Sequence, residues 1–170
     1  MQEVKGTYIL MIVHLLSEYN PEILEKSIKE MSIDIKSIDP EEWYDRKEVV
    51  PLLKNLSPDA IVAVAKNVYP TLKATTNYLD GIDDPVEMIK TMVPQYRENH
   101  RGERIGEYKI LDSGPDFIKI KRNTGFPPQV DEGIIRGILG MFKIVKVHIK
   151  TTVENVKWNY PEITFNVKWD

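Results

Sequence analysis

Hydrophobic residues recur at helical spacing through the first hundred residues of the chain. Apolar positions three and four residues apart form one stripe on each predicted helix. Asp39, Ser57 and Asp84 each precede a proline, which is the usual order of a helix N-cap and first helical position. The pattern predicts helices over residues 7–19, 21–31, 46–56, 57–79 (with Pro70 bending or ending the helix) and 85–99, and a short helical turn at 39–44.

The period of the pattern changes to two after residue 103. Strands are predicted at 104–111 and 116–122, on either side of the turn "DSGP", and at 144–152 and 162–170. The last two alternate apolar and polar residues, as strands with one buried face do in an antiparallel sheet. We therefore predict an α+β fold in a single domain, residues 1–170. Its N-terminal helical half (about 1–100) packs on a four-stranded antiparallel sheet of β-β-α-β-β order (about 103–170).

The helix predicted between the two hairpins, within residues 124–143, contains three glycines. Glycine inside a helix costs about 1 kcal/mol relative to alanine. On a helical wheel Gly133, Gly137 and Gly140 fall along one line beside a broad apolar face. Such a line lets another group approach closely. That group is the sheet, a neighbouring helix, the same helix of a second subunit, or a ligand above the glycines.

Composition excludes several kinds of chemistry. The 170 residues are 42% hydrophobic and 29% charged, with a net charge of −3 and no cysteine. The lack of cysteine excludes disulfides, thiolate metal sites, iron–sulfur clusters and a cysteine nucleophile, and it fits a cytoplasmic protein. The negative net charge does not suggest a nucleic-acid partner.

The apolar run "YILMIVHLL", residues 8–16, is too short to span a bilayer. Only Lys5 precedes it as a charged residue of the kind that begins a signal peptide, and no small-residue cleavage site follows. We expect a buried helix here and no membrane span. A helix facing a membrane surface is the alternative.

No catalytic constellation is found in the sequence. The GxSxG, HExxH and P-loop motifs are absent. His14, on the apolar first helix, is expected in the core, and His148 is expected to face solvent. His100 lies at the predicted end of a helix, where a histidine suits the helix dipole. We predict neither an enzyme nor a metal site.

Aromatic and long apolar side chains suggest a binding pocket between the helices and the sheet. They lie at helix ends or on apolar stripes, and pockets are mostly lined by such side chains. An ordinary packed core uses the same residues. The predicted pocket residues are Trp43, Tyr69, Met92, Tyr96, Ile138 and Phe142.

Two segments resemble a known superfamily of ligand-binding domains. "FPPQVDEGIIRGILGMF", residues 126–142, precedes a strand and then "ITFNVKW", residues 163–169. This order is similar to the end of the fold shared by 4-vinyl-reductase domains, heme–nitric-oxide-binding domains and Golgi transport-particle subunits. "DPEEWYDRKEVVPLLKNL", residues 39–56, resembles the "WY" segment of related, uncharacterised bacterial domains best known from myxobacteria.

The resemblance implies a hydrophobic pocket between the helical half and the sheet, which in that superfamily holds heme, acyl chains or other apolar ligands. It also implies a sensory or regulatory domain, often dimeric. Two features of those relatives are missing. Pro128 stands where many 4-vinyl-reductase domains have a cysteine, and the Tyr-x-Ser-x-Arg motif of heme–nitric-oxide-binding domains does not occur. His100 is the histidine nearest to the position of their heme ligand.

The leading hypothesis is a non-enzymatic sensory domain that binds a small apolar ligand, such as an acyl chain or hydrocarbon, without a cofactor. One alternative is a homodimerisation or protein-interaction module without a small ligand, in which the glycines pack against a second subunit. Another is a heme-based gas sensor. A signalling output domain, fused or separate, is an expected partner.

Overall fold

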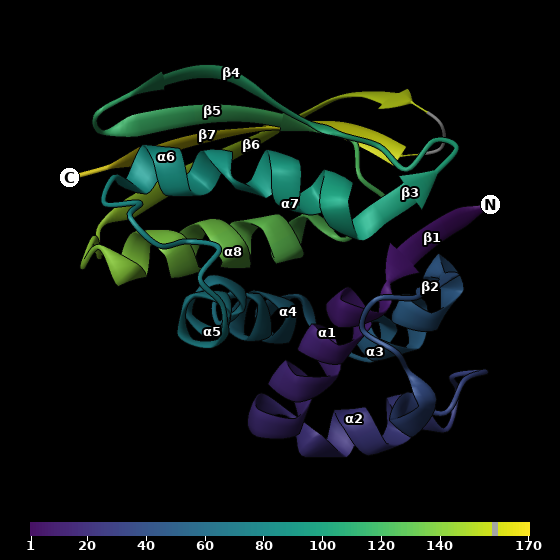
Figure 1. The fold of residues 1–170 in the computed structure, drawn as a ribbon. Helices are drawn as coiled ribbons and strands as arrows, with labels where there is room; N and C mark the ends of the chain where they lie inside the picture. The colour runs from purple at the N-terminus through teal and green to yellow at the C-terminus, as the bar shows by residue number, and fades with distance from the viewer. Residues whose placement is uncertain (158–159) are drawn as a thin grey trace.

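The computed structural model describes residues 1–157 and 160–170. Figure 1 shows a sheet on one side of the molecule, with α6, α7 and α8 against one of its faces and the other helices beyond them. The helices are α1 (Gly6–Tyr19), α2 (Pro21–Ile28), α3 (Val50–Lys54), α4 (Pro58–Ala65), α5 (Val68–Thr75), α6 (Pro85–Lys90), α7 (Met92–Asn99) and α8 (Pro128–Met141), with short 3-10 helices η1 (Ile35–Ser37) and η2 (Arg46–Val49). The strands are β1 (Gln2–Lys5), β2 (Trp43–Asp45), β3 (His100–Gly102), β4 (Tyr108–Gly114), β5 (Phe117–Arg122), β6 (Val147–Lys157) and β7 (Tyr160–Trp169).

The larger sheet has the strand order β4-β5-β7-β6, and every pair in it is antiparallel. Ile118 and Ile120 of β5 lie opposite Val167 and Phe165 of β7, and none of the four is more than 1% exposed. Lys119, between the two isoleucines, is exposed on the other face. The alternation read from the sequence for residues 162–170 therefore sets which face of β7 is buried. In residues 144–152 it does not hold throughout, because Val145 is 87% exposed. The α+β class and the β-β-α-β-β order are confirmed.

A second, smaller sheet joins the N-terminus to the middle of the chain. Strand β1 lies between β2 and β3 and is antiparallel to both. The sequence did not predict it, because strands of three or four residues are too short to show a period of two. Trp43 and Tyr44, placed by the prediction at the end of a helical turn, form β2 instead. Asp39 accepts a hydrogen bond from the amide of Glu41 within a turn and caps no helix.

The predicted helices over 57–79 and 85–99 are each divided in two. Pro70 and Pro94 lie in the first turn of α5 and of α7, the second piece in each case. Proline lacks the amide hydrogen and clashes with the preceding turn, so it is tolerated only where a helix begins. The break expected at Pro70 is therefore found a few residues earlier, and the one near Pro94 was not predicted.

Two of the three glycines of α8 pack against helix α4. A Cβ atom added to Gly137 would lie 2.1 Å from the carbonyl oxygen of Lys66, and one added to Gly133 would lie 2.6 Å from the Cβ of Ala65. Of the four groups considered from the sequence, these two glycines admit a neighbouring helix. Gly140 is different, because it is exposed and an added Cβ would meet nothing within 4 Å.

Helix α1 is buried along one side only. Ile9, Leu15 and Leu16 are at most 1% exposed. The side chain of His14 is 49% exposed, and its Nε2 lies 3.7 Å from the carboxylate of Glu18. The prediction of a core histidine is wrong, because position 14 falls on the outward stripe of the helix. Among the described residues, no helix is both long and apolar enough to cross a membrane.

Candidate functional site

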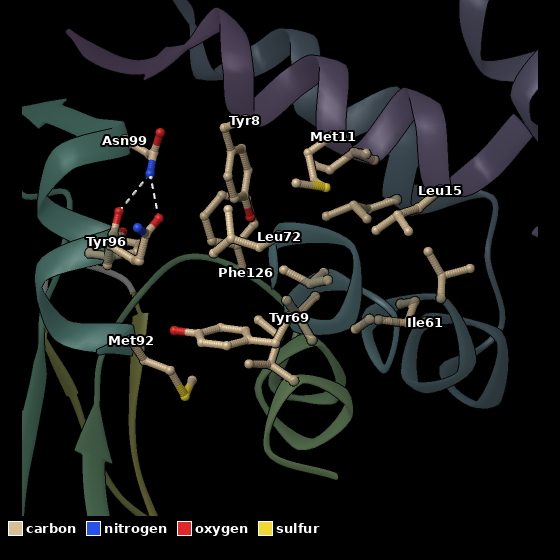
Figure 2. A pocket seen from close by; sticks show the side chains of 18 of the residues that line it. Tyr8, Met11, Leu15, Ile61, Tyr69, Leu72, Met92, Tyr96, Asn99 and Phe126 are labelled. Atoms are coloured by element: carbon tan, nitrogen blue, oxygen red, sulfur yellow. Dashed lines mark hydrogen bonds between the residues drawn. The ribbon is translucent and has the colours of Figure 1, made fainter. Parts of the chain in front are cut away.

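A cavity of about 160 Å³ lies among the helices, beneath the layer that covers the sheet. Helices α1, α3, α4, α5, α7 and α8 all contribute side chains to it. In Figure 2, Tyr8 and Met11 point into it from α1, Tyr69 from α5 and Met92 from α7. The lining is predominantly apolar, as small-molecule sites generally are.

Three of the six predicted pocket residues line this cavity. They are Tyr69, Met92 and Tyr96. Tyr69 and Met92 lie on helices divided by proline, and the hydroxyl of Tyr69 is 2.9 Å from the hydroxyl of Thr91 at the break between α6 and α7. That bond fixes the Tyr69 ring across the cavity. Whether these residues bind a ligand stays a prediction.

The other three predicted pocket residues lie outside the cavity. Trp43 is on β2, and the guanidinium carbon of Arg101 stands 4.3 Å from the centre of its aromatic ring. Ile138 is completely buried on α8, but the part of α8 that borders the cavity is one turn earlier, at Ile134. Phe142 follows the last turn of α8 and packs against the core there. The pocket was thus placed too far along α8.

The α1 wall of the cavity was missed. Met11, Ile12 and Leu15 line it, and the sequence marked that stripe as buried without marking it as part of a site. Helical spacing shows which side of a helix faces inward, but it does not distinguish a side chain beside a hollow from one that is fully packed. Phe126, in the "FPP" motif before α8, was quoted for the resemblance only.

Apart from Tyr69, Tyr96 and Tyr108, the polar residues of the lining gather at one end of the cavity. They come from the start of α1, the last turn of α7 and the start of β3, which the pairing of β1 with β3 brings together. Figure 2 shows Asn99 and Tyr8 at this end, and Leu15 and Ile61 at the other. The polar residues are Thr7, Tyr8, Gln95, Asn99 and His100.

His100 is 3% exposed and lines this polar end. Its Nδ1 lies 2.9 Å from the carbonyl oxygen of Tyr96. A carbonyl only accepts hydrogen bonds, so Nδ1 carries the proton and Nε2 presents a lone pair. Burial lowers the pKa of His100 to about 4, against the opposing effect of the hydrogen bond to Tyr96. The ring is therefore neutral near pH 7, and its buried Nε2 has no partner among the described residues.

Aromatic rings surround His100. The Tyr96 ring stacks on it with centroids 4.2 Å apart, while Tyr8 and Phe126 stand edge-on at 4.7 and 5.4 Å. The hydroxyl of Tyr96 donates to the carbonyl oxygen of Ile105, so it is already engaged. These contacts hold the imidazole in one orientation and supply no donor to Nε2.

Tyr8 also lies at this end of the cavity. Figure 2 shows its hydroxyl pointing toward the middle of the cavity. Burial raises the pKa of Tyr8, with the nearby Tyr96 and Asp131 acting in the same direction. The phenol therefore keeps its proton at neutral pH. Asn99, by contrast, is held by its own helix, because its Nδ2 donates to the backbone oxygen and the side-chain oxygen of Gln95.

A buried ion pair fixes two walls of the cavity. Arg122 and Asp131 are each 1% exposed, with Nη2 and Oδ2 2.8 Å apart. Arg122 also donates to the carbonyl oxygens of Thr124 and Phe126 at 2.6 Å, and the Tyr108 hydroxyl donates to Asp131. Since Tyr108 and Phe126 both line the cavity, the network sets their positions.

An unfilled apolar hollow deprives the side chains that line it of packing contacts. An occupant that restores those contacts is therefore favoured.

No protein-family model and no curated protein matches the sequence. The fold, however, is similar to solved H-NOX domains. A mutant of T. tengcongensis H-NOX is 16% identical, with 98% of this chain and 97% of that one covered and a TM-score of 0.73. A mutant Fe(II) unliganded H-NOX protein from K. algicida is 13% identical, with 98% and 96% covered and a TM-score of 0.72. A structure from work on heme redox potential and porphyrin distortion is 15% identical, with 98% and 95% covered and a TM-score of 0.77.

These comparisons support one part of the resemblance read from the sequence, the likeness to the heme–nitric-oxide-binding fold. The likeness to 4-vinyl-reductase and myxobacterial domains stays a prediction. At this level of identity the comparison establishes the architecture and leaves the ligand to be argued from the chain's own residues.

The residues around the cavity fit a heme at one point only. The neutral His100, with a free Nε2, has the chemistry of an axial ligand. The volume of about 160 Å³ is close to the roughly 150 Å³ that accommodates benzene, and a porphyrin is several times larger. No lysine or arginine is among the described lining residues to pair with the carboxylates of a heme. As folded here, the site does not fit heme.

Proposed function

We propose that this chain is a non-enzymatic ligand-binding domain of the sensory kind, which takes a small apolar molecule into the cavity bordered by α1, α5, α7 and α8. The cavity itself carries the proposal: about 160 Å³ of space with mostly apolar walls from six helices. The likeness of the fold to H-NOX domains supports the sensory part. In this proposal a bound ligand changes the packing of α8 and the sheet, and an output domain or partner responds.

The size of the cavity limits both the ligand and its affinity. An aromatic ring buries about 150–250 Å² of surface, and about 25 cal/mol per Å² gives roughly 5 kcal/mol before the costs of association. Such a ligand binds with a dissociation constant in the high micromolar to millimolar range. An extended acyl chain needs the helices to separate.

Binding of a weak apolar probe tests the proposal directly. Protein at fixed concentration is titrated with toluene in sealed samples while methyl resonances of the cavity-lining residues are recorded by NMR. We expect saturable shifts at methyl groups of residues such as Ile61, Leu72 and Met92. Native mass spectrometry of the purified protein provides a second reading, an adduct carried from the expressing cells.

A blocking variant and a matched control sharpen the result. Leu72 lies beside the cavity in Figure 2, and Leu72→Trp is expected to abolish the toluene shifts by filling the space. Leu111→Trp makes the same change on β4 at a side chain that is 47% exposed, and it should bind toluene as the unchanged protein does. Linear, non-saturating shifts in all three proteins would contradict the proposal.

Heme binding is the second candidate, favoured by the neutral His100 with its unpaired Nε2 and by the heme of the H-NOX neighbours. It requires a wider cavity than the one described. An absorption spectrum of protein mixed with hemin tests it. A shifted Soret band that is lost in His100→Ala would establish heme as the ligand and replace the apolar molecule. A spectrum equal to free hemin leaves the first proposal in place.

A further inference from the structure

Strand β6 forms one edge of the larger sheet, and among the described residues it pairs with β7 alone (Figure 1). Its first part, Val147–Val153, pairs with β7 in unbroken register. We propose that this edge is a docking site for an extended acidic segment of a partner protein, which adds to the sheet beside β6. The proposal stands apart from the cavity and requires no ligand there.

The backbone of β6 presents hydrogen-bonding groups at this edge. The amide of Asp170 donates to the carbonyl oxygen of Lys146 on β6's side of β7, and the amide of Trp169 donates in the opposite direction, to Asp116. Hydrogen bonding alternates along an antiparallel pair, so residues 148, 150 and 152 of β6 bond to β7. The amides and carbonyls of Val147, Ile149 and Thr151 therefore point away from the sheet, as an added strand requires.

The opposite edge of the same sheet is less suited to an added strand. Strand β4 has a register shift between Ile110 and Asp112, which divides its seven residues into two short parts. Helices α6 and α7 also contact β4. Irregularities and covering elements of this kind are the usual protection of an edge strand. Residues 147–153 of β6 have no such shift, so β6 is the edge that we assign to a partner.

Two kinds of side chain alternate along this part of β6. Val147 and Ile149 are half-buried on the face of the sheet that α8 covers, while His148 and Lys150 are exposed on the other face. An open groove of about 460 Å³ borders all four and extends to Arg136 of α8. Successive side chains of an added strand alternate in the same way. Apolar residues of the partner would lie over the valine and isoleucine, and the residues between them beside the lysine.

The charge at this edge selects an acidic partner. Lys143, Lys146, Lys150 and Lys168 form no ion pair among the described residues, whereas Arg136 is paired with Glu132. The chain as a whole has a net charge of −3, so this group of lysines is a local feature and not a property of the whole surface. Carboxylates at alternate positions of an added strand would pair with these lysines and direct its association.

The same lysines disfavour a second copy of this chain as the occupant. Antiparallel pairing of residues 147–153 with their own copy places Lys150 of one chain directly opposite Lys150 of the other. Like charges at facing positions of two strands are destabilising. Lysine on an edge strand commonly prevents self-association in this way. It presents no such obstacle to an acidic segment, which we therefore favour.

A capped octapeptide of alternating glutamate and valine is the probe. Titrated into ¹⁵N-labelled protein, it should give saturable shifts at the amides of Val147, Ile149 and Thr151. The same peptide with lysine in place of glutamate should bind at least tenfold more weakly. The glutamate–valine peptide with N-methyl groups on its amides keeps both kinds of side chain and loses its backbone donors, so its binding should be lost.

Two variants of the protein test the edge itself. Thr151→Pro removes an amide that points away from the sheet, where proline is tolerated, and it should abolish binding of the peptide. Lys150→Glu should weaken binding about fivefold to tenfold at low salt. Lys73→Glu makes the same change of charge on α5, at an exposed position away from the sheet, and should leave the affinity unchanged. If Thr151→Pro does not fold, the N-methylated peptide with the unchanged protein gives the same information.

Each contrary result overturns a stated part of the proposal. Absence of saturable shifts would remove the docking site. Equal binding of the glutamate and lysine peptides would show that charge does not select the partner. Full binding of the N-methylated peptide would mean that the peptide lies on the lysines without joining the sheet. A dimer of the unchanged protein in sedimentation experiments, dissociated by Thr151→Pro, would make a second copy the occupant. Tighter binding of a short DNA duplex at the same amides would assign the surface to nucleic acid.

Discussion

Helix α8 is packed in opposite ways on two of its sides. Toward α4, Gly133 and Gly137 leave so little room that an added Cβ would stand 2.6 Å or less from its neighbour. Toward α1 and α5, Val130 and Ile134 border a hollow of about 160 Å³. Both sides belong to one fourteen-residue helix within the same motif.

Both arrangements cost free energy, and only one of them is compensated within the protein. Two glycines in a helix cost about 2 kcal/mol, which the close α4 contact offsets. The hollow leaves the side chains that line it without part of their packing contacts, and nothing in the described chain fills it. The close contact with α4 shows that α8 can be tightly packed. The hollow on its other side is therefore not a general failure of packing. The contrast is the physical argument for a ligand on the α1 and α5 side.

Alanine substitutions at two isoleucines of α8, one turn apart, test this contrast with the largest effect. Ile138 is completely buried, so Ile138→Ala should lower the free energy of unfolding by about 4 kcal/mol. Ile134 borders the cavity and loses fewer contacts, so Ile134→Ala should cost about 2 kcal/mol. Urea denaturation measures both. Equal losses would mean that Ile134 is as well packed as Ile138 and would contradict the hollow beside Ile134.

The stability of the cavity side should also depend on pH, because His100 lines the cavity. The pKa of His100 is about 4 in the folded chain and about 6.5 when unfolded. Between pH 6.5 and pH 4, His100 is protonated in the unfolded chain and neutral in the folded chain. The free energy of unfolding therefore falls by about 3 kcal/mol as the pH falls from 6.5 to 4. Above pH 6.5 both states are neutral and this contribution is constant.

Urea unfolding at pH 7.5 and pH 4.5 measures the effect, and His100→Phe isolates it from the carboxylates. The variant should lose about 2–3 kcal/mol less than the unchanged protein between the two values. His14→Phe is the control, because His14 is half exposed and away from the cavity. An equal loss in all three proteins would show that His100 titrates normally and is not buried as described.

The sequence predicted the regular part of this architecture and only half of the site. Ile118, Ile120, Phe165 and Val167 alternate with polar residues, so the buried face of the sheet could be read from the period alone. His100 was harder to place, because its burial depends on a three-residue strand pairing with β1. A cavity depends on how side chains from distant segments pack against one another, and no local pattern of residues predicts that packing.

Gly137→Ala tests the tight side alone. The new Cβ would meet the carbonyl oxygen of Lys66 at 2.1 Å, so α4 and α8 must separate, at an expected cost of about 2–3 kcal/mol. Gly140→Ala is the matched change on the same helix, where an added Cβ meets nothing within 4 Å. It should stabilise the protein by about 0.5–1 kcal/mol. A stabilising Gly137→Ala would contradict the close contact with α4.

A further comparison adds one methyl group to each kind of packing. Val64 lines the cavity, so Val64→Ile has space to occupy and should stabilise the ligand-free protein by about 1 kcal/mol while weakening the binding of toluene. Val167 is 1% exposed in the packed face of the sheet, so Val167→Ile should destabilise by about 1–3 kcal/mol. The contrast requires that the two substitutions change the free energy of unfolding in opposite directions. Thermal or urea unfolding measures both changes. If Val64→Ile also destabilised the protein, the hollow would have no room for a methyl group, and therefore none for a ligand.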